Sequence, residues 1–420
     1  LENIREGRVS MSLVDRSVRR ILRQKMRLGL FEHPYTDPQH AALVVHHPAH
    51  RELALRAARS GIVLLKNDGS LLPLKNKPLR IAIIGPNADE PRNQLGDYVP
   101  AKVLQPVITV LDGIKQAVSK DTKVVYVKGC DVIGSQVDEI AKATEAAANA
   151  DIAIVVVGEN ARELPGKPPT DGEGYDAATL ELTGLQEDLV KAVVATGTPS
   201  VAVLINGRPL AVRWLAEHVP AILEAWLPGE MGGQAVAEIL FGRVNPSGRL
   251  PVTIPRHAGQ LPVYYNARKS KLYWVKQGWG HSYADLDPSP LYPFGFGMSY
   301  TRFEYRGLKL SQHQVTPTEP VEISLEVKNA GDRPGEEVVQ LYIEDVISSV
   351  STPVKDLKGF RKVALEPGET RTCSFKLEPK DLALLDANLT PVVEPGQFRI
   401  MVGASSEDIR LTGDLWVIDR

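Results

Sequence analysis

Cysteine, long apolar runs and an excess of either charge are missing from this sequence, and each absence excludes a class of protein. Only two of 420 residues are cysteines, Cys130 and Cys373, which is too few for a disulfide framework or a zinc cluster. The 49 Lys and Arg residues are balanced by 51 Asp and Glu residues. Because phosphate binding needs a basic surface, we expect no nucleic-acid partner. No apolar run approaches the roughly 20 residues that cross a bilayer, so we expect a soluble chain without a membrane contact.

Motifs of several common enzyme classes are also absent. The apolar segment Arg80–Ile84 leads into Gly85 as in a dinucleotide-binding fold, but Pro86 follows and the next glycine is Gly96. No Gly-x-Ser-x-Gly sequence of a serine hydrolase occurs. The nine histidines lack the spacing to carboxylates that metal sites use. We therefore expect no nucleotide, no metal and no other cofactor.

Residues 1–30 are basic and predict an amphipathic helix. Ser12 and Asp15 are its predicted N-terminal capping pair, and Gly29 is its predicted stop. Such a helix suits either a membrane-surface or partner-binding element, or a surface helix packed along one apolar stripe. The second interpretation is favoured, because short and strongly periodic segments usually face a core. The polar residues 32–50 have the composition of a linker.

From residue 51 onward, short apolar segments alternate with helical patterns. A helix is predicted over Glu52–Leu65, and the strand candidates that follow are Arg80–Ile84, Val124–Val127, Ile152–Val157, Val201–Ile205 and Ala221–Ala225. Helical spacing separates them at Val110–Ser119, Val137–Ala150, Gln186–Thr196 and Gly233–Phe241. This order predicts a mostly parallel sheet that helices cover on both faces.

The pattern changes again after residue 262. Residues 263–300 are rich in Tyr, Trp, Gly and Pro and are predicted to be a connector. Beyond Thr316, apolar residues recur at every second position, in Val321–Val327, Cys373–Leu377 and Phe398–Val402, with Gly-containing turns between them. Alternation without intervening helices predicts an antiparallel β-sandwich.

A long polar loop, Gly158–Thr179, follows the strand candidate Ile152–Val157. Ligands of open parallel sheets bind beyond the carboxyl ends of the strands, and loops of this length are usually functional or disordered. The loop contains Glu159, Glu163, Asp171, Glu173 and Asp176. Glu173 lies between two glycines, whose freedom lets the backbone present its side chain at a tip. Spacing alone leaves two interpretations open, a solvated acidic loop and a proton donor to a glycosidic oxygen.

An ordered series of short motifs distinguishes these interpretations. It consists of Asp15–Leu22 with Leu28–Phe31, Leu64–Gly69, Leu95–Tyr98, Gly172–Asp176, Asn206–Leu210, Pro228–Glu230 with Gly232 and Gly233, Asn245–Pro251 and Pro293–Thr301. In this series, and over essentially its whole length, the chain resembles the C-terminal part of a glycoside hydrolase family 3 enzyme.

The resemblance implies a domain order. Members of the family begin with a (β/α)8 barrel, continue with an α/β sandwich and often end in a fibronectin type III-like domain. Here residues 1–49 resemble the last barrel helix and linker, 50–262 the α/β sandwich, 263–300 a connector and 301–420 the terminal all-β sandwich. The barrel of the family carries the aspartate nucleophile, which has no counterpart here. A barrel-containing chain or segment is therefore an expected partner.

The resemblance also implies site residues. Glu173 is the best match to the acid/base carboxylate, and Glu159 and Glu163 remain alternatives within the same loop. Asp97, Tyr98 and Tyr175 are expected to bind substrate, and the two tyrosines are equally well explained by packing. Ala177 stands where relatives usually have Arg after the Tyr-Asp pair, so a substrate contact from that position is not expected.

Two functions of different classes follow from these expectations. The first is a retaining exo-β-glycosidase that acts on a β-linked oligosaccharide or glycoside, with β-glucosides as the first choice and β-xylosides as the second. The other is a non-catalytic, carbohydrate-binding accessory chain. Aromatic residues make up only 6% of the sequence, and Trp274 and Trp279 are its one candidate pair for a sugar platform.

Overall fold

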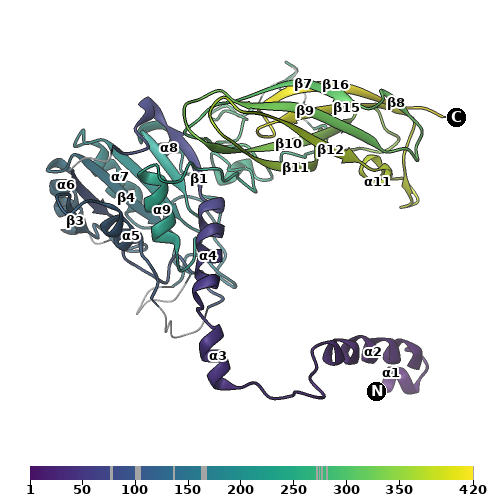
Figure 1. The fold of residues 1–420 in the computed structure, drawn as a ribbon, viewed down its shortest axis with the longest axis horizontal. Coiled ribbons are helices and arrows are strands. Elements are labelled where there is room, and N and C mark those ends of the chain that lie inside the picture. The colour runs from purple at the N-terminus through teal and green to yellow at the C-terminus, as the bar shows by residue number, and fades with distance from the viewer. Residues whose placement is uncertain are drawn as a thin grey trace. The chain divides into compact units, whose positions relative to one another are not determined.

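The computed structural model describes residues 1–75, 79–99, 106–135, 138–161, 168–270, 273, 275, 278–280 and 282–419. These residues form two units, Leu1–Glu52 and Leu53–Arg420. The first unit is helical, and the second contains an α/β region followed by a β region (Figure 1).

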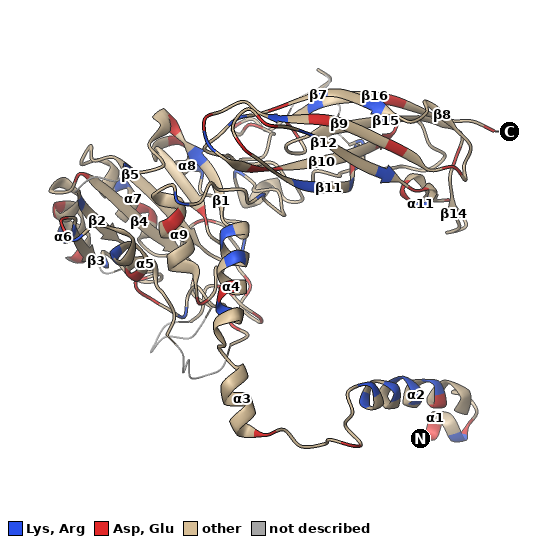
Figure 2. Ribbon diagram, in the orientation of Figure 1, with Lys and Arg blue, Asp and Glu red and all other residues tan. Residues whose placement is uncertain are grey.

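The first unit contains the predicted basic helix. Its helices are α1 (Glu2–Arg5), α2 (Met11–Arg27), α3 (Pro38–Val44) and the start of α4 (Pro48–Gly61). Lys and Arg residues, blue in Figure 2, recur along the ribbon of α2. The predicted stop is confirmed, because Gly29 has a φ of +66° and its amide donates to the Met26 carbonyl at 3.0 Å.

The predicted cap of α2 is wrong, and the predicted linker contains a helix that its polar composition did not indicate. α2 begins at Met11, directly after the extended Ser10, so the expected cap Ser12 lies inside the first turn. The predicted linker contains α3, whose start is fixed by Pro38 and by the Asp37 side chain, which accepts a hydrogen bond from the Gln39 amide at 2.9 Å. An Asp-Pro pair favours the start of a helix, and this local preference explains why a helix forms in a segment whose polar composition predicted a linker.

A six-stranded sheet forms the centre of the α/β region. Its strand order is β1-β6-β5-β4-β2-β3, and all neighbours are parallel except the antiparallel pair β1 and β6. The strands are β1 (Val63–Asn67), β2 (Arg80–Ile84), β3 (Lys123–Val127), β4 (Ile152–Gly158), β5 (Ser200–Ile205) and β6 (Ala221–Glu224). Every residue of β4, β5 and β6 is buried, as expected of apolar strands covered on both faces.

Helices cover both faces of this sheet (Figure 1). One core contains apolar side chains of α4, α5 (Val110–Ala117) and α9 (Gly232–Leu240). The other core contains those of α6 (Asp138–Ala148), α7 (Gln186–Val194) and α8 (Arg213–His218). The predicted mostly parallel, helix-covered sheet is therefore confirmed. Short 3-10 turns occur at Asp68–Ser70 and Ala258–Gln260.

The predicted helix Glu52–Leu65 is wrong in its last part, because α4 ends at Gly61 and β1 follows. Leu64 packs into one core of the sheet, while Val63 and Leu65 pack into the other. Only a strand sends successive side chains to opposite faces, so burial on both faces selects β1. A connector residue covers this edge strand, since the Met298 amide donates to the Leu64 carbonyl at 2.9 Å.

The β region is a sandwich of a five-stranded and a three-stranded sheet, in the orders β11-β10-β15-β16-β8 and β12-β9-β7. Alternating burial in β9 and β12 confirms the predicted period of two, whereas in β15 Met401 is buried as well as its neighbours Ile400 and Val402. The strands are β7 (Phe303–Leu310), β8 (Gln314–Val315), β9 (Val321–Asn329), β10 (Gly335–Asp345), β11 (Asp356–Leu365), β12 (Thr370–Leu377), β15 (Gly396–Gly403) and β16 (Ile409–Val417). Smaller elements are α11 (Pro379–Leu382) and the hairpin β13 (Leu384–Leu385) and β14 (Pro391–Val392).

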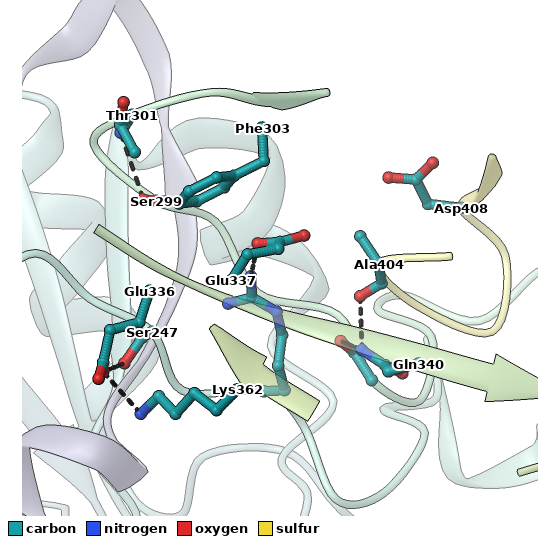
Figure 3. Close-up of polar contacts among 12 residues, drawn as sticks. Ser247, Ser299, Thr301, Phe303, Glu336, Glu337, Gln340, Lys362, Ala404 and Asp408 are labelled. Carbon is teal, nitrogen blue, oxygen red and sulfur yellow. Dashed lines mark hydrogen bonds and ion pairs between the residues drawn. The ribbon is translucent and has the colours of Figure 1, made fainter. Parts of the chain in front are cut away.

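Polar contacts join the α/β region to the β region (Figure 3). The side chains of Arg249 and Glu337 are only 9% and 2% exposed and lie 2.7 Å apart. The Tyr305 hydroxyl also donates to Glu337, at 2.7 Å. Nearby, the Ser247 hydroxyl donates to Glu336 at 3.0 Å. The two regions are thus held together by a buried charge pair as well as by the chain that connects them.

Candidate active site

Buried polar side chains gather at the carboxyl ends of four neighbouring strands. Asn87 follows β2, Glu159 follows β4, Asn206 follows β5, and Glu224 is the last residue of β6. All four are buried, in contrast to the apolar residues that fill the strands themselves. β2 and β4 are adjacent although β3 lies between them in sequence, so this edge contains the point where the strand order reverses. Ligands of open α/β sheets bind at such a point.

Asn87 joins the strand ends laterally. Its side-chain amide donates to the Glu159 carbonyl at 3.0 Å and to the Ile205 carbonyl at 3.3 Å. Asn93 in turn donates to the Asn87 side-chain oxygen at 2.7 Å. The turn before Asn87 requires glycine, because a Cβ on Gly85 would lie 2.1 Å from a carbonyl oxygen of β4. The floor of the site is therefore fixed by backbone and amide contacts.

Glu224 is the most deeply buried carboxyl of this floor. Its two oxygens accept hydrogen bonds from the Trp226 amide at 2.9 Å and from the Asn206 side chain at 3.3 Å. Burial raises the pKa of Glu224 to about 8, although both hydrogen bonds oppose the shift. Glu224 is therefore largely protonated at neutral pH and adds no charge to the floor.

Glu159 is anchored by Arg208. One carboxylate oxygen accepts the amides of Gly207 and Arg208 at 3.1 Å each, and the other accepts the Arg208 guanidinium at 3.0 Å. Burial raises the pKa of Glu159, and the hydrogen bonds from Arg208 oppose this rise. The carboxylate that was an alternative proton donor thus lies at the base of the loop, with both oxygens engaged.

The loop that follows β4 is held by the same guanidinium. Arg208 also donates to the carbonyls of Thr170 and Tyr175 and lies 3.3 Å from a carboxylate oxygen of Asp171. The loop and the segment after β5 approach each other closely at Gly207, where an added Cβ would lie 2.1 Å from the Asp171 carboxylate. Arg208 therefore connects the end of a buried strand to the polar loop.

Glu173 lies in this loop between two glycines with left-handed backbone conformations. Gly172 has a φ of +102° and Gly174 a φ of +80°, which agrees with the predicted tight presentation of Glu173. The Glu173 amide donates to the Asp97 carboxylate at 2.9 Å, and the Tyr98 hydroxyl donates to the Glu173 carboxylate. Three of the predicted site residues, Asp97, Tyr98 and Glu173, are thus brought together from two loops.

The predicted site residues differ in how much of each side chain is free of contacts and exposed to solvent. Asp97 uses one carboxylate oxygen to hold the Glu173 amide, whereas the rings of Tyr98 and Tyr175 are exposed. The Glu173 side chain is also exposed, so the partial burial that favours a general acid is not provided by the described residues of this chain. The alternative donor Glu163 lies outside the described residues.

Four residues of the site, Asn87, Asn206, Arg208 and Glu224, were not predicted as site residues. Each stands at or just beyond the end of an apolar strand, which is the one sequence signal that could have identified them. Within the described part of the chain, no group of three or more His, Cys, Asp or Glu side chains is arranged to hold a metal ion. The described helices include none with the length and hydropathy needed to cross a membrane.

Comparison with known proteins relates the chain to one family. Residues 62–300 match the model of the glycosyl hydrolase family 3 C-terminal domain, and residues 337–406 match a fibronectin type III-like domain. A β-xylosidase of Formosa agariphila is 42% identical over 402 residues, covering 94% of this chain and 54% of the relative. A periplasmic β-glucosidase of Salmonella typhimurium is 37% identical, covering 97% of this chain and 56% of the relative.

Solved structures give the same result. A mutant β-glucosidase of Listeria innocua, in complex with laminaribiose, superimposes with a TM-score of 0.90 at 34% identity. The match covers 100% of this chain and 56% of that one. The chain thus spans about half the length of the relatives it matches.

Proposed function

Because the chain belongs to glycoside hydrolase family 3, we propose that it is the acid/base-bearing part of a retaining exo-β-glycosidase. In this proposal a barrel, in a partner chain or an adjoining segment, carries the aspartate nucleophile. The substrate is a β-linked oligosaccharide or glycoside. β-Glucosides are the first choice and β-xylosides the second, since relatives with both names match the chain.

The observation that carries the proposal is the geometry around Glu173. Its carboxylate stands at a glycine-flanked tip and accepts a hydrogen bond from Tyr98, while Asp97 holds its amide. None of these contacts belongs to a hydrophobic core, and the carboxylate is accessible to a ligand. This differs from Glu159, whose oxygens are fully used inside the protein.

The proposed chemistry has two steps. In the first, the barrel aspartate attacks the anomeric carbon and Glu173 protonates the departing glycosidic oxygen. In the second, the Glu173 carboxylate removes a proton from water, which attacks the glycosyl-enzyme and releases the sugar with retained configuration. Tyr98 orients the Glu173 carboxyl through both steps, and the exposed Tyr175 ring lies on the same loop, where it contacts substrate.

The exposure of Glu173 sets a requirement on the barrel. A general acid works best when its pKa lies close to the working pH, which for a carboxylic acid needs partial removal from water. In retaining enzymes the two carboxyl groups lie roughly 5–5.5 Å apart. A barrel that brings its nucleophile to this distance also covers Glu173, so docking supplies geometry and burial together.

The competing proposal, a non-catalytic sugar-binding chain, has less support. Its only candidate platform was the pair Trp274 and Trp279, of which Trp279 is exposed and Trp274 lies outside the described residues. We also propose the boundaries 1–49 for the last barrel helix and linker, 50–262 for the α/β sandwich, 263–300 for the connector and 301–420 for the terminal domain.

Glu173→Gln in the barrel-containing protein tests the proposal. Aryl β-glucosides with poor leaving groups should lose about 10²–10⁴-fold in kcat/KM, whereas those with good leaving groups should lose far less in the first step. Asp176→Asn, which alters another exposed acid of the same loop, is the matched control. Equal losses for both kinds of substrate in Glu173→Gln would reject Glu173 as the proton donor.

A further inference from the structure

We propose that Arg208 is a positioning residue for the proton donor, which sets the location of the Glu173 carboxyl without touching the substrate. The inference rests on the proposed function of Glu173. Its basis is that one guanidinium contacts both the buried Glu159 at the end of β4 and three groups of the loop that presents Glu173.

Arg208 contacts residues that precede Glu173 in the sequence and a residue that follows it. Arg208 holds the carbonyl of Thr170 and the carboxylate of Asp171 before Glu173, and the carbonyl of Tyr175 after it. Residues 170–175 therefore form an arc whose two ends are tied to the same cation. Glu173 lies within this arc, so its backbone position follows that of Arg208.

The arc needs an external constraint because its own backbone supplies little. Gly172 and Gly174 flank Glu173, and glycine restricts backbone rotation less than any other residue. Without the guanidinium, Glu173 itself would keep two polar contacts among the described residues, from its amide to the Asp97 carboxylate and from the Tyr98 hydroxyl to its carboxylate. The amides of Thr170 and Asp171 would still donate to the Asn160 carbonyl, so the end of the arc at Tyr175 is the part that depends most on Arg208. A displacement of about 1 Å at a reacting group can cost about 100-fold in rate.

Arg208 is itself held firmly enough for this task. Its amide and its guanidinium both donate to Glu159, and its carbonyl accepts the Asn206 side chain at 2.7 Å. Its side chain is 20% exposed. Lysine could keep the charge beside Glu159, but a single ammonium has no planar fork with which to reach Thr170 and Tyr175 together.

The test uses the barrel-containing protein and three variants. Arg208→Lys keeps the charge. Arg208→Met combined with Glu159→Gln replaces both charged side chains by neutral ones of similar length, so that the Glu159 carboxylate is not left buried without its guanidinium. Arg213→Ala, which removes an arginine five positions further along on α8, is the matched control. Thermal unfolding of each variant establishes that it is folded.

The first readout is the dependence of kcat/KM on the leaving group. Both Arg208 variants should lose about 10–100-fold on aryl β-glucosides with poor leaving groups and less than about 3-fold on those with good ones. The control should lose nothing on either. The second readout is hydrogen exchange, which should become faster for the amides of residues 170–175 in the Arg208 variants alone.

Two results would overturn the inference, and they are distinguishable. If folded Arg208 variants lose activity equally on all leaving groups, or lose none, while Glu173→Gln discriminates between them, Arg208 does not position the donor and the proposed function stands. If Glu173→Gln itself fails to discriminate between leaving groups, Glu173 is rejected as the proton donor of the proposed function, and this inference is rejected with it.

Discussion

The hydroxyl of Tyr98 donates a hydrogen bond to the carboxylate of Glu173, a residue 75 positions further along the chain. Tyr98 belongs to the segment after β2 and Glu173 to the loop after β4, so this contact joins two loops at the same end of the sheet. The hydrogen bond is the main cause that raises the pKa of Tyr98, because an ionised phenol would lose it. Tyr98 therefore remains a donor at neutral pH.

Removing the Tyr98 hydroxyl should displace the Glu173 carboxyl, which is the proposed proton donor, while the carboxyl itself remains present. Tyr98→Phe should lower kcat/KM about 10-fold on substrates with poor leaving groups, since the Glu173 carboxyl loses one of its orienting contacts. Steady-state kinetics in the barrel-containing protein measure the effect. Tyr264→Phe is the control, because Tyr264 is similarly exposed, at 70% against 81% for Tyr98. Equal kinetics of the two variants would contradict an orienting role for Tyr98.

Azide should restore turnover of Glu173→Gln on substrates with good leaving groups. The glycosyl-enzyme still forms with such substrates, but water cannot attack it without a general base, whereas azide needs none. The product should be a β-glycosyl azide, because attack on the covalent intermediate inverts its configuration a second time. Chromatography and NMR identify this product.

The controls for azide rescue are Glu163→Gln and Glu159→Gln, which change the two alternative acids of the same loop and should show no rescue. Rescue of Glu163→Gln in place of Glu173→Gln would move the assignment within the loop. An α-glycosyl azide from Glu173→Gln would instead reject the retaining mechanism.

The charge pair between the two regions of the second unit should be important for stability. Arg249→Met leaves the Glu337 carboxylate buried without its guanidinium and should lower the free energy of unfolding by about 3–5 kcal/mol. Arg306→Met breaks an exposed pair with Glu326 and should cost about 0–1 kcal/mol. Urea denaturation compares the two variants. A similar small loss in both would show that Glu337 finds other partners or water.

Glu224 should make stability depend on pH. Its pKa is raised to about 8 in the folded chain, above the ordinary value of 4.5. Between these values the folded state keeps a proton that the unfolded state releases, so stability is fully present at low pH and falls as the pH rises toward 8. Glu224→Gln remains neutral throughout and should escape this loss, which is on the order of a few kcal/mol.

The measurement is urea denaturation at pH 5 and pH 8 for wild type, Glu224→Gln and the exposed control Glu217→Gln. The advantage of Glu224→Gln over wild type should grow with pH, and the control should follow wild type. A constant difference between Glu224→Gln and wild type at both pH values would contradict the raised pKa.

The strands were predictable where apolar residues run without interruption, as in β4 and β5, because such runs are typical of strands buried on both faces. β1 was not predictable in this way. Its apolar residues directly continue the helical pattern of α4, and only packing into two separate cores shows where the helix ends. Local periodicity holds no information about which cores are available.

In the site, too, features set by neighbouring residues could be predicted and features set by distant contacts could not. The backbone conformations of Gly172 and Gly174 follow from a local property of glycine, so the presentation of Glu173 could be inferred from three adjacent residues. The strand end could have drawn attention to Arg208, but its pairing with Glu159 could not be inferred, because the two residues lie 49 positions apart and nothing near either marks the contact. Asn87 is comparable, since it reaches across 72 positions to the Glu159 carbonyl.

Met298 lies against β1, and its amide donates to the Leu64 carbonyl. β1 is the outermost strand on its side of the sheet, and the free edge of such a strand is where a second molecule can add its own strand and begin an aggregate. The connector occupies part of that edge from within the same chain. Truncation before Met298 would therefore leave the backbone edge of β1 unpaired while the rest of the sheet is unchanged. The shortened protein should form amyloid-like assemblies more readily than the whole chain.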